Sequence, residues 1–152
     1  MSILSTDRMT ENDVVSLTAA YVKADGWTVH RALTVHQKGV DIFAERAGTL
    51  LYAEAKGAVN SRTGKQIDTY GASHSALMQA SSIRTRDHEA RVAIVLPDVE
   101  LYRFHMNSIS RVLEAARIEV WLMHAGGSIR TIIEATEPVR WAQPPLPTRP
   151  IT

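Results

Sequence analysis

Two neighbouring stretches of the sequence, GVDIFAE at residues 39–45 and TLLYAEAK at residues 49–56, carry the pattern that decides the fold. In both stretches apolar residues recur at every second position, which is typical of β-strands because successive side chains point to opposite faces. The dipeptide Ala47-Gly48 between them is a short turn signal. The two stretches are therefore predicted to form a hairpin.

Three charged residues are expected to meet on this hairpin. Glu54 and Lys56 must emerge on the same face of their strand, and antiparallel pairing can bring Asp41 beside them. Two close carboxylates can bind a hard cation such as Mg²⁺, and an adjacent lysine can orient water or offset phosphate charge. A metal held there can polarise a phosphoryl oxygen and supply hydroxide near neutral pH. The pattern thus predicts a site for phosphodiester hydrolysis.

Hydrophobic periodicity predicts the elements on either side of the hairpin. The first helix has a start signal, because Thr10 and Asp13 resemble a capping box. In chain order the expected elements are a helix over 10–26, strands over 27–35, 40–45 and 49–56, a helix over 66–83, a strand over 91–96, a helix over 101–116 and strands over 118–125 and 128–134. This order, αβββαβ followed by a helix and a β-hairpin, indicates an α/β fold with a mixed β-sheet flanked by helices.

Composition favours one ordinary globular domain. The chain has 152 residues, of which 45% are hydrophobic and 22% charged. We expect a single domain over residues 1–136 and a tail over 137–152 that holds five of the six prolines. With no cysteine, the chain has no disulfide, no Cys-ligated metal and no thiol nucleophile.

Charge and hydropathy limit the partners. The formal net charge is only +1, so binding to nucleic acid has to depend on a local site rather than on the whole surface. The first eleven residues lack the apolar run of a signal peptide, and no stretch of 18 apolar residues occurs anywhere in the sequence. We therefore expect a soluble, cytoplasmic protein with no membrane partner.

The sequence resembles the PD-(D/E)XK superfamily of restriction-endonuclease-like nucleases. The match consists of Asp41, then Glu54-Ala55-Lys56 after a 12-residue gap, and Gln66 with Tyr70 in the Gln-x-x-x-Tyr spacing of one branch. The expected order of elements from Met9 to about Leu96 also agrees, which is roughly two-thirds of the chain. The resemblance implies a three-layer core with a mixed sheet and a nuclease that uses Mg²⁺ or Mn²⁺ to cut DNA.

The resemblance also implies roles for particular residues. Asp41 and Glu54 would hold the metal together with the carbonyl group of Ala55. Lys56 would position the attacking water, and Gln66, at the start of the next helix, would contact substrate or metal. Cutting both strands of a duplex calls for two sites, so a homodimer is compatible with this reading.

A further carboxylate on the first helix occurs in many members of the superfamily. Glu11 is the candidate here, but it lies one turn earlier than the usual spacing, at which this sequence has Val15. A second metal site is therefore left open.

Two other interpretations of the hairpin also stay open. The chain can be a catalytically inactive nuclease-fold module that binds DNA or protein, or Glu54 and Lys56 can be an ordinary cross-strand pair on a solvent-exposed face. A basic connector is the second candidate for contact with DNA. It contains Arg84, Arg86, His88 and Arg91, and it can equally be a solvated turn.

Overall fold

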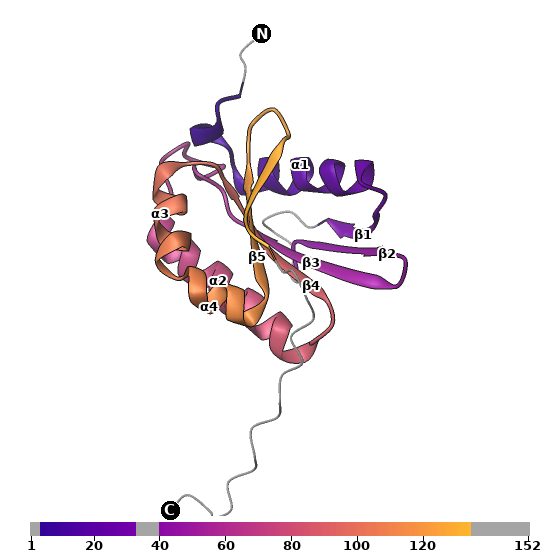
Figure 1. The fold of residues 1–152 in the computed structure, drawn as a ribbon. Helices are drawn as coiled ribbons and strands as arrows, with labels where there is room; N and C mark the ends of the chain where they lie inside the picture. Colours follow the sequence, from indigo (N-terminus) through magenta and orange to yellow (C-terminus); the bar gives the residue numbers. More distant parts are fainter. Residues whose placement is uncertain (1–3, 33–39, 135–152) are drawn as a thin grey trace, which may run out of the picture.

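The computed structural model describes residues 4–32 and 40–134 (Figure 1). In chain order its elements are η1 (Thr6–Arg8), α1 (Glu11–Ala24), β1 (Thr28–Ala32), β2 (Ile42–Arg46), β3 (Thr49–Ala55), α2 (Thr69–Arg86), β4 (Arg91–Pro97), α3 (Glu100–Ser108), α4 (Ser110–Ala116), β5 (Ile118–Met123) and β6 (Ile129–Ile133). The expected proline-rich tail over 137–152 and the end of the expected first strand lie outside the described residues. None of the described helices is long and apolar enough to cross a membrane.

The six strands form one mixed sheet in the order β1-β2-β3-β4-β5-β6. Strands β3, β4 and β5 run parallel to one another, whereas the β1–β2, β2–β3 and β5–β6 pairs are antiparallel. Helix α1 covers one face of the sheet, and α2, α3 and α4 lie on the other (Figure 1). The expected α/β class and the three-layer, restriction-endonuclease-like arrangement are confirmed.

Each face of the sheet has its own hydrophobic core. On the α1 side, Val14 and Val22 pack against alternate strand residues such as Leu51 and Ala53. On the α2 side, the strands contribute residues of the opposite alternation, and helix residues such as Ala76 and Met106 cover them. Strand β4 is buried over six consecutive positions, Val92 to Pro97, which agrees with a strand covered on both faces.

Helix α1 begins where the sequence predicts. The Thr10 hydroxyl accepts from the Asp13 backbone N–H (3.1 Å), and the Asp13 carboxylate accepts from the Thr10 N–H (2.8 Å). A side chain at Gly57 would come within 2.7 Å of the Thr10 carbonyl carbon, so only glycine lets this helix start pack against the chain just after β3. The capping box and Gly57 together place Glu11 beside the end of β3.

Two helix boundaries differ from the prediction. The second helix begins at Thr69 rather than Gln66, because the Asp68 side chain accepts from the Tyr70 N–H and makes Asp68 the N-cap. The segment expected as one helix over 101–116 is divided at Ile109 into α3 and α4. Gln66 consequently precedes α2 and forms an isolated β-bridge with Val59.

The first strand departs from simple alternation. Val29 pairs with Ala44 but Arg31 pairs with Phe43, so the register shifts at His30. Regular alternation predicted Arg31 on the same face as Val29. The extra residue instead leaves His30 in contact with the Phe43 ring and directs Arg31 to the same side of the sheet as Phe43.

Candidate active site

The hairpin brings Asp41 and Glu54 together, as predicted. Ile42 pairs with Ala53, so the preceding Asp41 lies opposite Glu54. The Asp41 carboxylate accepts a hydrogen bond from the Ala55 backbone N–H (2.8 Å) and is within hydrogen-bonding reach of the Glu54 carboxyl group. Two acids this close repel each other when both are ionised, so a proton on one of them stabilises the pair.

Burial controls the ionisation of this pair. Glu54 is only 3% exposed, and burial, reinforced by the neighbouring charge of Asp41, raises its pKa to about 8. Burial also raises the pKa of Asp41, although the Ala55 N–H, the Glu54 hydrogen bond and the charge of Lys56 act in the opposite direction. At neutral pH the pair therefore keeps one proton, which a bound cation would displace.

Lys56 and Glu11 complete the charged group. Lys56 follows β3 directly, is half-buried, and its backbone N–H donates to the Val95 carbonyl (3.1 Å). Its positive charge lowers the pKa of all three nearby acids. Burial raises the pKa of Glu11, and the charge of Asp41 raises it further. Glu11 thus lies within electrostatic reach of the pair despite its early position in the sequence.

Glu54 lines a pocket of about 360 Å³ between the β1–β3 part of the sheet and α2. Gln79 of α2 also lines this pocket. With its amide nitrogen turned toward Glu54, Gln79 donates to both carboxylate oxygens, at 3.2 and 3.0 Å, whereas the opposite orientation would place oxygen against oxygen. Gln79 is therefore the glutamine that contacts the acid pair.

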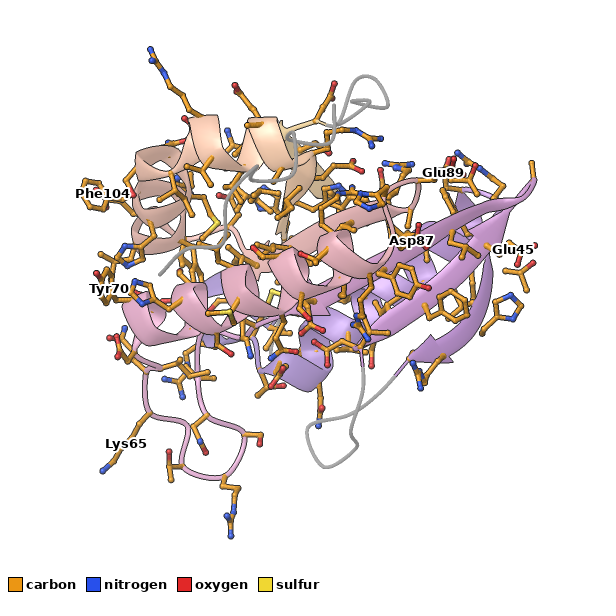
Figure 2. All side chains as sticks on the ribbon, turned by 90° about the horizontal axis from the view of Figure 1, so that it is seen from below. Glu45, Lys65, Tyr70, Asp87, Glu89 and Phe104 are labelled. Carbon is orange, nitrogen blue, oxygen red and sulfur yellow. The ribbon has the colours of Figure 1, made fainter. Side chains whose placement is uncertain are left out.

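Gln66 does not reach this group. It lines a separate pocket of about 150 Å³ beside Ile67 and Leu101. Its partner in the motif, Tyr70, is exposed near the start of α2 (Figure 2), where its ring lies tilted against His74 and edge-on to His105. The Gln-x-x-x-Tyr spacing thus places both residues away from Glu54. No local motif could have found Gln79, because its contact depends on how α2 packs across β3.

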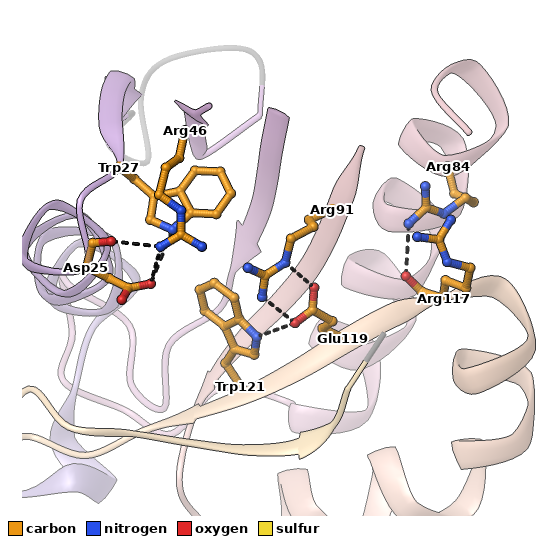
Figure 3. A network of polar contacts seen from close by, with 8 residues as sticks. All are labelled: Asp25, Trp27, Arg46, Arg84, Arg91, Arg117, Glu119 and Trp121. Atoms are coloured by element: carbon orange, nitrogen blue, oxygen red, sulfur yellow. Dashed lines mark hydrogen bonds and ion pairs between the residues drawn. The ribbon is translucent and has the colours of Figure 1, made fainter. Parts of the chain in front are cut away.

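The basic connector does not form the expected exposed patch (Figure 3). Arg84 lies within α2, is 4% exposed and donates to five backbone carbonyls, including those of Ala116 and Arg117. Arg91 is bound to Glu119 by two hydrogen bonds of 2.9 and 2.8 Å. These two arginines hold the fold together, and of the four only Arg86 and His88 are exposed.

The acid pair offers the donor set that Mg²⁺ or Mn²⁺ requires. Its oxygen donors are the two carboxyl groups and, at the adjoining residue, the Ala55 carbonyl; Mg²⁺ typically takes one or two protein carboxylates and keeps several waters. Within residues 4–32 and 40–134, no three His, Asp or Glu side chains are arranged to hold a metal together. The donors of the acid pair are thus two carboxyl groups and a backbone carbonyl, a set that Mg²⁺ accepts when waters fill its remaining positions.

This chain is similar to known proteins in structure but not detectably in sequence. No family model matches the chain, and no curated protein matches its sequence. An XisH family protein from Nostoc punctiforme PCC 73102 superposes with a TM-score of 0.53 and 19% identity, covering 78% of this chain and 96% of that one. An fdxN element excision controlling factor protein from Anabaena variabilis gives 0.54 and 17%, with 80% and 98% covered. These likenesses show the fold.

Proposed function

We propose that this protein is a metal-dependent nuclease that hydrolyses phosphodiester bonds in DNA. The observation that carries the proposal is the placement of Asp41 opposite the buried Glu54, with Lys56 directly after them at the end of β3. A buried pair of acids without a cationic hydrogen-bond partner destabilises the folded chain, and such arrangements are concentrated at functional sites. The mixed-sheet fold shared with the structural neighbours is compatible with this assignment.

Each residue of the site would have its own role in hydrolysis. Asp41, Glu54 and the Ala55 carbonyl would hold Mg²⁺ or Mn²⁺, which when bound supplies positive charge to the phosphoryl oxygens. Lys56 would hold the attacking water in line with the phosphorus atom and offset the charge that develops on the phosphate. Gln79 would keep the Glu54 carboxylate oriented through its two hydrogen bonds.

Alanine substitutions test these roles. D41A and K56A should each abolish Mg²⁺-dependent cleavage of DNA, because one removes a metal donor and the other the group that positions water. K65A is a matched control, since Lys65 lies on an exposed loop (Figure 2) and should leave cleavage unchanged. Circular dichroism melting would show that the variants fold. Undiminished cleavage by folded D41A or K56A would refute the assignment.

A catalytically inactive module that binds DNA or protein is the second candidate. The near-neutral net charge of +1 and the absence of a three-side-chain metal group among the described residues favour it. Titration calorimetry with Mg²⁺ and Mn²⁺ separates the two candidates, because an inactive module should show no saturable binding that D41A removes. If the enzyme cuts both strands of a duplex, it would act as a homodimer, which sedimentation in the presence of DNA can measure.

A further inference from the structure

A row of three aromatic rings crosses the sheet next to the acid pair. The His30 ring of β1 lies 5.4 Å from the Phe43 ring of β2, and the Phe43 ring is stacked on the Tyr52 ring of β3 at 5.0 Å with an interplanar angle of 22°. We call His30, Phe43 and Tyr52 the aromatic row. Tyr52 is two residues before Glu54 on the same strand, so both side chains share one face.

The aromatic row is partly exposed: Tyr52 packs against the core on the α2 face, and exposure increases toward His30. Helix α2 packs on β3 and β4 of this face, whereas the row extends from β3 outward over β2 to β1. Phe43 and Tyr52 are half-buried, and the His30 side chain is 45% exposed. His30 contacts Glu45, which Figure 2 labels at the outer end of β2. Rings in such a position can receive a planar ligand.

The pocket beside the row has a polar, positively charged rim. Tyr52 and Glu54 both line this 360 Å³ space, which is within the range of about 300–1,000 Å³ for small-molecule sites. Arg31 and Arg86 line it from β1 and the end of α2, and both are exposed. Within the part of the chain that the structure describes, neither guanidinium is paired with a carboxylate.

We propose that the aromatic row and this pocket bind an unpaired nucleotide of a nucleic-acid strand. The base would stack on Tyr52, and the adjoining phosphates would lie against Arg31 and Arg86. The faces of bases inside a duplex are already occupied by their neighbours, so rings can stack only on a base that has left the helix. Resting on the proposed nuclease function, this inference assigns its substrate class: a single strand, a frayed end or a locally opened duplex.

Binding measurements in EDTA test the inference without cleavage. Fluorescence anisotropy would compare a labelled single-stranded DNA, the matching single-stranded RNA and the DNA duplex. We expect the native chain to bind at least one of the single strands about tenfold more tightly than the duplex, and Y52L to lose about tenfold in that affinity while its duplex affinity stays unchanged. Y52F keeps the ring and should bind as the native chain does. The DNA and RNA arms show which sugar is accepted.

Two further measurements keep the inference open to refutation if Y52L folds poorly. A single strand with one abasic position at the site of contact should bind the native chain more weakly than the intact strand. R86Q, an exposed substitution, should lower the slope of log affinity against log salt by about one. Equal affinity for single strand and duplex, or equal binding of intact and abasic strands, would show that the aromatic row only stabilises the sheet.

The outcome is distinguishable from failure of the nuclease proposal. If D41A abolishes cleavage but the strands bind equally, only the assignment of substrate class is overturned. If the native chain prefers single strands through Tyr52 yet cleaves nothing with Mg²⁺ or Mn²⁺, the nuclease proposal fails, and the nucleotide site stands as the function of a binding module.

Discussion

Glu54 and Glu119 are equally buried, but their side chains have opposite kinds of partner. Each is 3% exposed and each lies on a strand of the same sheet. Glu119 accepts two hydrogen bonds from Arg91 and one from the Trp121 indole N–H at 3.3 Å (Figure 3). Glu54 instead meets a second acid, Asp41, and an uncharged amide, Gln79.

The difference in partners means that Glu119 has a structural role, whereas Glu54 is available to bind a cation. A buried carboxylate with a bidentate arginine is ionised and satisfied, so it does not require another ligand. Burial and the neighbouring charge of Asp41 raise the pKa of Glu54 to about 8, so the Asp41–Glu54 pair keeps a proton at neutral pH. A divalent cation can replace that proton. We therefore expect the sheet to bind a divalent cation at β3 rather than at β5.

Removing the cation from Glu119 should have the largest effect on stability. R91M leaves Glu119 buried without its partner, and we expect it to lower the free energy of unfolding by about 3–5 kcal/mol. R46M is a matched control, because both arginines lie over the Trp27 ring but Arg46 pairs with the exposed Asp25. Its loss should cost less than about 1 kcal/mol. Urea unfolding measures both. Equal losses would mean that burial does not distinguish the two arginines.

Removing the ionisable group of Glu54 should raise the free energy of unfolding instead of lowering it. The folded chain binds more protons than the unfolded chain between pH 4.5 and about 8, so the native protein loses stability as pH rises through this range. E54Q carries no titrating proton there, and we expect it to be more stable than the native chain by about 1–2 kcal/mol at pH 8, with little difference at pH 5. Thermal melting over this pH range measures the difference.

A stabilising effect of E54Q that does not change with pH would contradict this account. It would indicate better packing or hydrogen bonding of the amide rather than relief of a buried charge. E119Q is the matched comparison. Because Arg91 already compensates Glu119, the amide should destabilise the chain at neutral pH instead of stabilising it.

The parts of this site that depend on local geometry were predictable from the sequence. Alternation and the turn at Ala47-Gly48 fix the hairpin, and the hairpin alone places Asp41 opposite Glu54. The parts that depend on contact between distant elements were not predictable. Gln79 meets Glu54 only because of how α2 crosses β3, whereas the Gln-x-x-x-Tyr spacing pointed to Gln66, which lies before the helix.

Two smaller features of the site have meaning only in the fold. Gly57 is an ordinary loop residue in the sequence, yet its missing side chain lets the start of α1 bring Glu11 to the site. The shift of register at His30 has no marker in the sequence, and it turns Arg31 toward the pocket. A regular strand would have hidden Arg31 from the proposed nucleotide site.

The smallest effect to measure is the proton that metal binding should release. At pH 7 the acid pair keeps one proton, so binding of Mg²⁺ should release about one proton per ion, and this release should fall toward zero above pH 8. Titration calorimetry in two buffers of different ionisation enthalpy measures the number. E54Q keeps an oxygen donor but no titrating group, so any ion it still binds should release close to none. If the native chain binds Mg²⁺ at pH 7 without proton release, the pair is already ionised in the free protein. Glu54 and Glu119 would then differ in their hydrogen-bond partners but not in their protonation.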